Sequence, residues 1–562
     1  MKVWKSKLFL FLVFLLAAII IGRLFYLQIL NYKFYQSQAL GQQAGFSQTK
    51  GSRGEIFLSN SGGSHGNYSS SQIKSLAINK DEWLLSSTPS KIEDKEVFAD
   101  ELSNAIGETK ESILSKINSS DSYIVLKKDL SQGEVDSINN LDLKGLTLEN
   151  NPGRYYPQED SLSQMIGFVG GDDNGQYGIE GYYNDILNGQ EGIMEAKSGF
   201  DSIGDSFSYL NGSDLYLTID YNIQFEAESL LEEAKKNINI DSGQIIVLNP
   251  HSGRVLALAN FPNFNPNAYS KETNFDIFQN ATVQKIFEPG SIFKPFTMGM
   301  ALEEGKVTPE TRFVDTGSVK IGPDTVYNFD HKKYGDQDMS GILEKSINVG
   351  AVFLSQKLSH QTFIDYLEKL GLNDKTGIDL QGEVASRNEV LKNGSDFGFA
   401  TASFGQGIEM TPMQLISAFS IFANGGKMVK PYVVDKIIHD EEEQDASPQT
   451  GRQVISEKTA SEVTTMMTNV VNRGFGSGAK VPGYYLAGKT GTAQVPIPGK
   501  LGYDQNKTIQ SFIGFGPALK PEFLILVKLD NPKVPQSSLS AAPIFKKLAQ
   551  YIINYWQIPP DY

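Results

Sequence analysis

The sequence predicts an α/β fold for the C-terminal part of this chain, with strands at both ends of a segment whose middle is helical. Two strand-like runs, residues 244–248 and 255–259, lie early in this segment, and two more, 511–515 and 523–529, lie near its end. The apolar pattern between residues 291 and 425 repeats with a helical period. Strands so far apart share one core only if the helical stretch is inserted between them, so we predict an α/β sandwich with a helical insertion.

Composition excludes several classes of function. The formal net charge of −15 disfavours nucleic acid or an anionic membrane surface as the main partner. The chain of 562 residues has no cysteine, which excludes disulfides, thiolate metal sites, cysteine catalysis and a lipoprotein anchor. Its five histidines are scattered and form no His-Glu-x-x-His motif. We therefore expect no histidine-based triad, no metal site and no cofactor.

The N-terminus has the pattern of a membrane anchor. Three lysines in residues 1–7 precede an apolar run over residues 8–30, which is interrupted only by Arg23 and Gln28. As an α-helix this run spans about 35 Å, enough for a hydrocarbon core of about 30 Å. A cleaved signal peptide is the alternative, but isoleucines rather than a cleavage site follow Ala18. We predict a cytoplasmic tail (1–7) and an uncleaved transmembrane anchor (8–30), with the rest of the chain outside.

Residues 31–210 form a separate region of mixed character. Runs rich in Gln, Ser and Gly, at 36–48 and 59–71, alternate with short helical patterns such as that over residues 100–117. No set of side chains in this region is typical of a catalytic or metal site. We therefore predict a spacer or pedestal that separates the anchor from residues 211–562 and offers surface to partners.

The elements of the C-terminal domain can be predicted in order. Residues 215–219 read as a strand and Asp220 as the N-cap of a helix. The strands 244–248 and 255–259 are joined by Asn-Pro-His-Ser-Gly, which is a hairpin signal. Residues 541–556 read as a final amphipathic helix. One face of the first helix is formed by Ile223, Ala227, Leu230, Leu231 and Ala234.

The most informative stretch is residues 288–298, Glu-Pro-Gly-Ser-Ile-Phe-Lys-Pro-Phe-Thr-Met. Its Pro-Gly pair predicts a chain break, and the apolar run after it predicts a buried helix that ends near Gly305. Ser291 then lies in the first turn, with the Cβ of Lys294 about 5–6 Å away on the same face. An apolar setting lowers the pKa of a lysine, and the neutral amine can then take the proton of a serine hydroxyl. The positive end of the helix favours the negative charge that results.

The Ser-x-x-Lys spacing alone proves little, because it recurs at Ser47/Lys50, Ser71/Lys74 and Ser477/Lys480. Ser71 lies in a run of serine and glycine, and Ser477 lies between glycines. Neither setting offers a rigid apolar helix that would lower the pKa of a lysine. Ser291 is therefore the preferred nucleophile.

Two further motifs follow Ser291 in the chain. The first is Ser346-Ile347-Asn348, and the second is Lys489-Thr490-Gly491-Thr492, placed after an apolar run and so expected on a strand. Both tripeptides recur elsewhere, at residues 137–139 and 375–377, without a supporting context. The order of the three motifs, rather than any one of them, makes the set specific.

With these motifs the chain resembles the class B penicillin-binding proteins, which are monofunctional peptidoglycan D,D-transpeptidases. The resemblance implies a β-lactamase/transpeptidase-like fold: an antiparallel sheet flanked by helices, with a helical subdomain, preceded by an elongated α+β pedestal and one transmembrane helix. The chain departs from the family at residues 58–61, Leu-Ser-Asn-Ser, where Asp-Arg-Asn-Gly is usual. The resemblance also rests on the segments 53–56, 154–157, 178–180, 217–220, 404–407, 411–412 and 541–543.

The resemblance assigns roles to the motif residues. Ser291 would attack the carbonyl between the two D-alanines of a stem peptide and hold the acyl group as an ester. Lys294 would be the base, its pKa lowered by burial and by the second cation, Lys489. Ser346 would pass a proton toward the leaving amine, and Asn348 would hold the peptide amide.

The third motif would bind the other end of the substrate. Lys489, Thr490 and Thr492 would hold the terminal carboxylate, and Gly491 is part of the same binding segment. The backbone N–H groups of Ser291 and Thr492 would form the oxyanion hole, where loss of one donor typically costs about 100- to 1000-fold in rate.

The implied function is the cross-linking of stem peptides ending in D-Ala-D-Ala, for cell division or elongation, by a target of β-lactams. We expect a polytopic membrane glycosyltransferase and other wall-synthesis or division proteins as partners, and no nucleic acid. A D,D-carboxypeptidase or β-lactamase would share every motif but needs a base for water, for which Glu288, Glu344 and Glu409 are the acidic candidates. A non-catalytic scaffold or β-lactam sensor is a further alternative.

The predicted anchor can be tested in intact spheroplasts that carry the protein. Protease added from outside should remove nearly the whole chain, because only residues 1–7 are expected on the inner side. Immunoblotting with antibodies against the C-terminal domain measures the loss. A mature protein that begins after Ala18, or full protection from the protease, would show that the topology is wrong.

Overall fold

A computed structural model describes residues 14–15, 23, 48–58, 74–120, 122–141, 143–193, 211–386, 388, 391, 394–445, 451–497 and 502–562. Most of the predicted anchor (8–30) and of the polar runs 36–48 and 59–71 lies outside these residues. Within the described ranges, no helix is both long enough and apolar enough to cross a bilayer.

The chain divides into two compact units. One unit comprises Met1–Gly54, Ile186–Ser213 and His439–Glu441, and in it strand β1 (Gln48–Lys50) pairs antiparallel with β8 (Glu191–Ile193). The other unit comprises the remaining residues and contains all three motifs.

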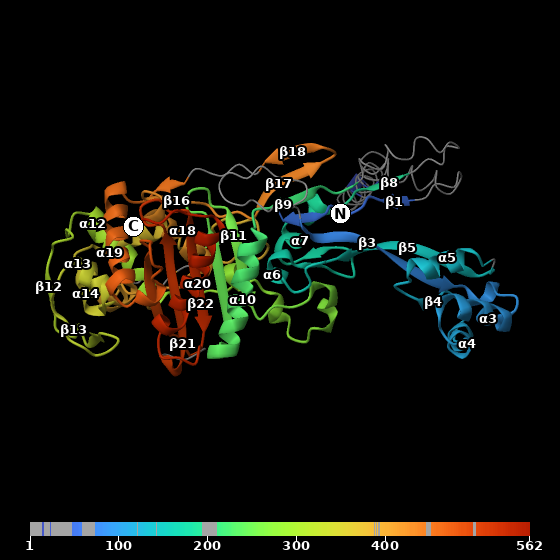
Figure 1. The fold of residues 1–562 in the computed structure, drawn as a ribbon, viewed down its shortest axis with the longest axis horizontal. Helices are drawn as coiled ribbons and strands as arrows, with labels where there is room; N and C mark the ends of the chain where they lie inside the picture. The colour runs from blue at the N-terminus through green and yellow to red at the C-terminus, as the bar shows by residue number, and fades with distance from the viewer. Residues whose placement is uncertain are drawn as a thin grey trace, which may run out of the picture. The chain divides into compact units, whose positions relative to one another are not determined.

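The second unit is built around a five-stranded sheet in the order β11-β10-β22-β21-β20 (Figure 1). Every neighbouring pair of strands is antiparallel. The early hairpin joins the late strands directly, since β10 pairs with β22 along its whole length. The predicted union of distant strands in one sheet is therefore confirmed. The strands are β10 (Ser242–Leu248), β11 (Val255–Phe261), β20 (Ala487–Pro496), β21 (Tyr503–Gly516) and β22 (Phe523–Asp530).

A second sheet joins the region before residue 185 to the strands that follow it. Strand β9 (Asp214–Leu217) pairs in parallel with β2 (Ile56–Leu58) and antiparallel with β17 (Val434–His439). On the other side of β2, the long strand β3 (Lys74–Ser87) pairs with β4 (Ile124–Lys127) and β5 (Leu146–Tyr155).

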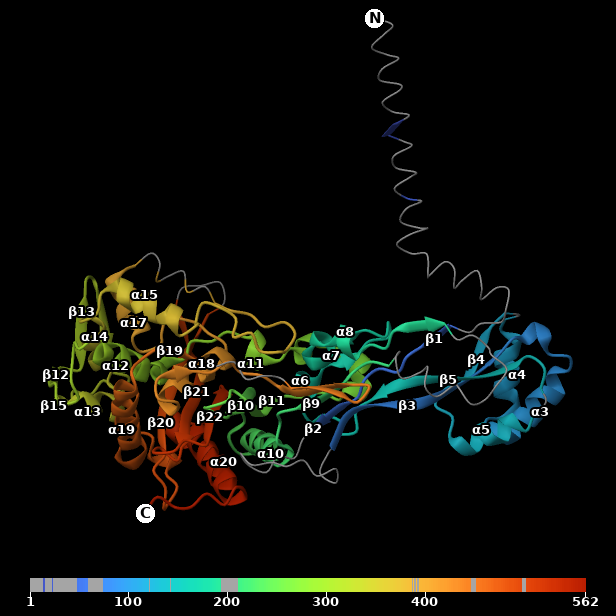
Figure 2. The ribbon, with the colours of Figure 1, turned by 90° about the horizontal axis from the view of Figure 1, so that it is seen from above.

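Three helices pack beside β4 and β5 and share one apolar core (Figure 2). They are α3 (Lys95–Ile106), α4 (Lys110–Asn118) and α5 (Gln132–Asn139). The helical pattern predicted over residues 100–117 therefore covers parts of two helices. The break falls at Gly107, which caps α3 in a left-handed conformation with φ +67°, and Thr109 then caps the start of α4.

Two segments singled out by the resemblance, 154–157 and 178–180, meet in a buried ion pair. The Arg154 guanidinium lies 2.7 Å from Glu180, and their side chains are 4% and 0% exposed. The hydroxyl of Tyr156 also donates to Glu180, at 3.3 Å. Breaking a buried pair leaves an uncompensated charge, so this pair fixes the two segments to each other.

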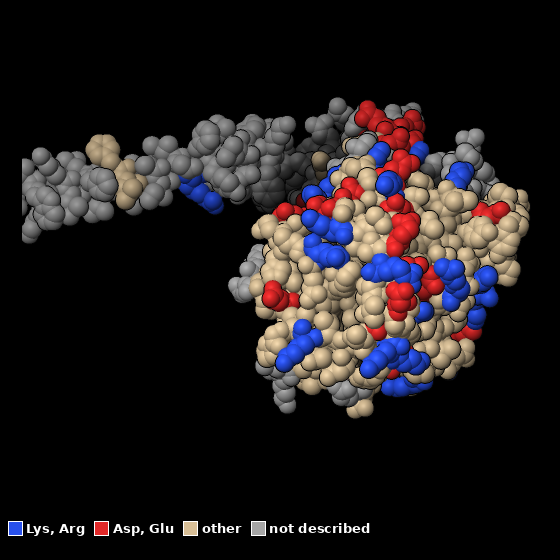
Figure 3. Space-filling view, turned by 90° about the vertical axis from the view of Figure 1, so that its left-hand side faces the viewer, with Lys and Arg blue, Asp and Glu red and all other residues tan. Residues whose placement is uncertain are grey.

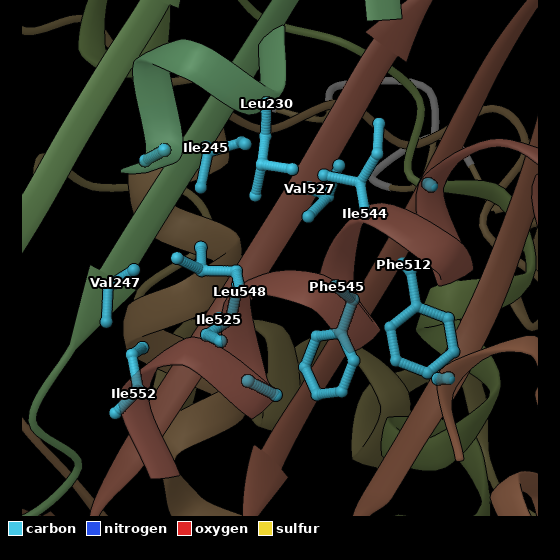
Figure 4. Close-up of a cluster of buried hydrophobic side chains, with 14 of the residues drawn as sticks. Leu230, Ile245, Val247, Phe512, Ile525, Val527, Ile544, Phe545, Leu548 and Ile552 are labelled. Carbon is cyan, nitrogen blue, oxygen red and sulfur yellow. The ribbon is translucent and has the colours of Figure 1, made fainter. Parts of the chain in front are cut away.

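Two helices cover one face of the five-stranded sheet and form the main core with it (Figure 4). Asp220 caps α10 (Tyr221–Ile238) by accepting from the N–H groups of Asn222 and Ile223, as predicted. The second helix is α20 (Ala541–Tyr555), the predicted C-terminal helix. The apolar side chains that meet between them include Leu230, Ile245, Val247, Phe512, Ile525, Val527, Ile544, Phe545, Leu548 and Ile552.

The other face of the sheet is covered by helices of the predicted insertion. Phe515 of β21 contacts Phe419 of α18, with ring centroids 6.5 Å apart, and Phe419 contacts Phe296 of α12. Because both faces are covered, β22 is apolar along almost its entire length. The helices of the insertion are α12 (Lys294–Glu303), α13 (Met339–Glu344), α14 (Asn348–Ser355), α15 (His360–Lys369), α17 (Asp396–Ala402) and α18 (Pro412–Ala423). A further helix, α19 (Glu457–Arg473), lies beyond the predicted end of the insertion at residue 425.

The helix observed near Ser291 differs from the predicted one in where it begins. Ser291 lies in a 3₁₀ turn, η8 (Gly290–Phe293), and Lys294 is the first residue of α12. Pro295 has no N–H to donate to the Ser291 carbonyl, as an α-helix requires, so the Lys294 N–H donates to it instead. The helix ends as predicted, near Gly305 with its φ of +61°.

The main core predicts the effect of a truncation on α20. Leu548→Ala removes a fully buried side chain and should lower the free energy of unfolding by about 2–5 kcal/mol. Thermal unfolding followed by circular dichroism measures the change. Lys546→Ala, at an exposed position of the same helix, is the matched control and should leave the midpoint nearly unchanged. Equal effects of the two variants would contradict the assigned packing.

Candidate active site

The three motifs meet at a cleft of about 320 Å³. Five of the predicted site residues line it: Ser291, Ser346, Asn348, Thr490 and Thr492. The other three, Lys294, Lys489 and Gly491, are buried behind the wall of the cleft. The aromatic side chains of Phe329, Tyr334, Phe404 and Phe475 complete much of the lining.

Ser291 is positioned by close backbone packing. The Gly290 N–H donates to the Gly405 carbonyl at 2.9 Å. A Cβ on Gly405 would lie 2.1 Å from the Gly290 oxygen, and Gly405 has a φ of +81°. Only glycine fits there, which explains why the Phe-Gly-Gln-Gly segment 404–407 accompanies the catalytic motifs. The sequence indicates this segment only through the family resemblance and gives no structural role for it.

Lys294 is held by the second motif. Its side chain is 1% exposed, and its Nζ donates to the Ser346 carbonyl at 2.6 Å, the Ser346 Oγ at 3.1 Å and the Asn348 Oδ1 at 2.7 Å. Burial, and then the charge of Lys489, hold the pKa of Lys294 well below its ordinary range. When neutral, the amine has only two N–H donors, which the Ser346 carbonyl and the Asn348 Oδ1 take up, so its lone pair is left for a hydroxyl and can accept a proton from it.

Lys489 approaches the same hydroxyl from the sheet. It lies on β20, is 0% exposed, and its Nζ donates to the Ser346 Oγ at 3.0 Å and to the Thr490 carbonyl at 3.0 Å. Burial lowers the pKa of Lys489 to about 7. The Ser346 hydroxyl thus bridges two buried amines, an arrangement that can relay a proton between them.

Ser346 and Asn348 are fixed by the turn between α13 and α14. Ser346 has a φ of +51°, which is uncommon for a residue other than glycine and is typical of functional sites. Asn348 begins α14, and its Nδ2 donates to the Tyr327 carbonyl at 2.9 Å. Its Oδ1 accepts from Lys294, so the side chain has a single orientation.

The third motif places alternate residues on opposite sides of β20. Thr490 and Thr492 line the cleft, and the Thr492 hydroxyl lies 3.3 Å from that of Ser537, a lining residue that the sequence did not indicate. A Cβ on Gly491 would lie 2.4 Å from the Ser511 hydroxyl and 2.9 Å from Ile292. Gly491 therefore allows β20 to approach the turn of Ser291 and does not line the cleft.

The acidic candidates for activating water lie elsewhere. Glu344 binds Arg473 at 2.9 Å, and neither Glu409 nor Glu288 lines the cleft. Glu288 is 7% exposed and accepts from the Gly407 N–H and the Tyr503 hydroxyl, while burial raises its pKa to about 7.

One carboxylate, Asp330, does line the cleft. It accepts from the Tyr334 hydroxyl at 2.6 Å and lies 3.6 Å from the Lys332 ammonium. Among the cleft residues that the structure describes, no carboxylate is without such partners.

The chain matches two protein families. Residues 243–550 match the penicillin binding protein transpeptidase domain, and residues 49–206 match the penicillin-binding protein dimerisation domain. The first match covers the three motifs and the five-stranded sheet.

Known relatives cover most of the chain. It is 34% identical to the Stage V sporulation protein D of Bacillus subtilis over 427 residues, which are 74% of this chain and 66%, just under two thirds, of that protein. It is 31% identical to the probable peptidoglycan D,D-transpeptidase PenA of Neisseria meningitidis serogroup A, with coverage of 78% and 75%.

Solved structures confirm the transpeptidase-type fold. The aztreonam complex of penicillin binding protein 3 from Mycobacterium tuberculosis superposes with a TM-score of 0.69 at 25% identity, covering 92% of this chain and 98% of that chain. Penicillin Binding Protein 2X from Streptococcus thermophilus has the same fold, with a TM-score of 0.75 at 20% identity and coverage of 91% and 81%.

The pair of buried lysines predicts a pH dependence. Lys489→Met removes a cation that lowers the pKa of Lys294, so that pKa should rise and less of Lys294 should be neutral at a given pH. We expect acylation by penicillin at pH 7 to slow by at least about 100-fold. The remaining rise of the rate with pH should shift to higher pH.

Stopped-flow acylation between pH 6 and pH 10 measures this shift. Lys507→Met, at an exposed position on the neighbouring strand β21, is the matched control and should keep the wild-type profile. A Lys489→Met profile with an unchanged or lower midpoint would contradict the coupling between the two lysines.

Proposed function

We infer that this chain, which belongs to the class B penicillin-binding proteins, is a serine-type peptidoglycan D,D-transpeptidase that cross-links stem peptides in cell-wall synthesis. The observation that supports this function best is the pair of buried lysines, Lys294 and Lys489, that share the hydroxyl of Ser346 at the cleft that Ser291 also lines. Burying two amines is unfavourable for folding, and a proton relay is the reason that the fold keeps them.

We propose the following roles in acylation. Neutral Lys294 takes the proton of the Ser291 hydroxyl, whose oxygen attacks the carbonyl between the two D-alanines. The N–H groups of Ser291 and Thr492 stabilise the oxyanion. The proton then passes from Lys294 through Ser346 to the departing amine, the C–N bond breaks, and D-alanine leaves.

Substrate binding follows the two walls of the cleft. On the sheet wall, the hydroxyls of Thr490 and Thr492 bind the terminal carboxylate, and Lys489 behind them contributes positive charge. On the opposite wall, Asn348 orients the amide that precedes the scissile bond. Gly491 acts through close packing of its strand.

The second half-reaction distinguishes the candidate functions. A hydrolase needs a base that holds water on the ester, and the described carboxylate in the cleft, Asp330, is engaged by Tyr334 and Lys332. An amine from a second stem peptide needs no carboxylate to hold water: in its neutral form it attacks the ester carbonyl, the C–O bond to Ser291 breaks, and the proton that the amine loses passes through Lys294 to the Ser291 oxygen. A non-catalytic scaffold would not require two amines of lowered pKa, and a β-lactam sensor would need them for acylation but would give no cross-linked product.

The location follows from the same function. We propose a single-pass protein of the cytoplasmic membrane with residues 1–7 inside and the catalytic domain outside, beside nascent wall strands. A tethered enzyme meets acceptor strands at high effective concentration. A polytopic membrane glycosyltransferase that makes these strands, together with other division or elongation proteins, would be the partners.

Penicillin tests the function through the ester it forms. Mass spectrometry of the treated protein should place a single adduct on the peptide that carries Ser291, and Ser291→Ala should abolish it. Release of the adduct should take many minutes or longer, because the carboxylate found among the described cleft residues, Asp330, is engaged by Tyr334 and Lys332 and is not available to activate water. Donor strands and an acceptor amine supplied together should give cross-linked product.

Two results would replace this function by hydrolysis. One is turnover of penicillin within seconds. The other is the release of D-alanine and a trimmed peptide alone while acceptor is abundant. An adduct on Ser47, Ser71 or Ser477, or labelling that survives Ser291→Ala, would overturn the assignment of the nucleophile.

A further inference from the structure

Lys345 lines the cleft directly before Ser346, at the end of α13. Its Nζ donates to the Gln337 Oε1 at 2.7 Å and lies 5.6 Å from the centroid of the Tyr334 ring. Both partners are neutral. The neighbouring carboxylate, Glu344, is engaged by Arg473 and by the Ser340 hydroxyl, so Lys345 acts on it only through its charge and forms no direct ion pair among the described contacts.

Lys332, the other lysine that lines the cleft, has a carboxylate close to its ammonium group. It lies 3.6 Å from Asp330, which also accepts from the Tyr334 hydroxyl. On the face of the molecule that carries α13 and α14, basic and acidic side chains are interspersed (Figure 3). The surroundings therefore do not form a broad positive patch, and selection of an anion has to come from an individual cation.

The position of Lys345 indicates which part of a ligand it meets. Lys345 and Asn348 both line the cleft and belong to the same turn, three residues apart, with Ser346 between them. If Asn348 orients the amide before the scissile bond, Lys345 is the cationic lining residue nearest to it in the chain, and we take Lys345 to meet the group attached beyond that amide, away from the terminal D-alanines.

We propose that Lys345 is a specificity-determining residue that favours ligands with a carboxylate beyond this amide. The preferred donor is then a stem peptide with a free carboxylate at that point, rather than its neutral, amidated form. The inference rests on the proposed function. An ammonium and a carboxylate about 4–6 Å apart in a partly solvated cleft should change the rate of acylation about 5- to 10-fold, less at high salt.

Two penicillins that differ by one carboxylate provide the probe. Benzylpenicillin carries a neutral phenylacetyl group beyond its amide, and α-carboxybenzylpenicillin carries a carboxylate there. The measured quantity is the ratio of their second-order acylation rate constants on the full chain. Because each ratio is taken within one variant, a general loss of activity or of folded protein cancels.

We expect Lys345→Gln to lower the ratio of the carboxylated to the neutral penicillin about 5- to 10-fold, and Lys345→Arg to restore most of it. The wild-type ratio should fall as salt is raised, whereas that of Lys345→Gln should not. Lys332→Gln, in the same cleft, leaves Asp330 with the Tyr334 hydroxyl but without its lysine, so it should lower the ratio clearly less than Lys345→Gln does.

The test can be repeated with donor peptides ending in D-Ala-D-Ala that carry a carboxylate before the last amide, either free or amidated. Lys345→Gln should lower the ratio of the acylation rate constants of the free and amidated peptides, as it does for the two penicillins. An unchanged ratio in Lys345→Gln overturns the inference, as does an equal change in Lys332→Gln, which would point to the general field of the cleft. If neither penicillin acylates the wild-type chain, the proposed function itself fails. The two failures can be told apart. If both penicillins acylate Ser291 but the ratio of their rate constants does not depend on Lys345, only the inference about Lys345 fails.

Discussion

The arrangement of the catalytic domain depends on two buried amines that reach one hydroxyl. Lys294 and Lys489 both lie within 3.1 Å of the Ser346 Oγ, and neither has a carboxylate partner among its described contacts. Desolvation and mutual repulsion both favour the neutral form of at least one of them. The two protons therefore belong to a coupled pair rather than to separate residues. A site of this kind sacrifices stability for reactivity, and the surrounding fold has to compensate for that cost.

The fold compensates by burying apolar surface on both sides of the strand that carries Lys489. Helices α10 and α20 cover one face of the sheet, and the helices of the insertion cover the other. The nucleophile's turn is fitted against the sheet through glycine: Gly491 lets β20 approach Ile292, and Gly405 lets its own loop approach Gly290. The two close approaches define the position of Ser291 without using any of the polar groups that react.

The cleft also separates chemistry from recognition. The reacting amines are fully buried, while the charge that remains available to a ligand, that of Lys345, lies on the lining itself. Asp330, the carboxylate that could interfere with an anionic ligand or hold a water molecule, is engaged by Tyr334 and Lys332. A change of ligand preference can therefore arise at Lys345 without disturbing the coupled pair behind it.

The sequence by itself determined the local elements and the identity of the reactive groups. The cap at Asp220, the hairpin of β10 and β11 and the end of α12 near Gly305 follow from patterns within a few residues, because caps, turns and periodicity are local effects. The order of the three motifs can be read along the chain without any knowledge of the fold. The same patterns marked Ser291, Lys294 and Ser346 as candidates but gave no distances between them.

Only the tertiary structure decided how these groups are shared. In the folded protein, Lys294 donates to the carbonyl of Ser346, and Gly491 and Gly405 allow close packing. Glu344 forms an ion pair with Arg473, and Lys345 lines the cleft and forms no direct ion pair with a carboxylate among the described contacts. Each of these results depends on segments that are far apart in the chain. Burial, pairing and the shift of a pKa are set by neighbours in space, which no local pattern of residues specifies.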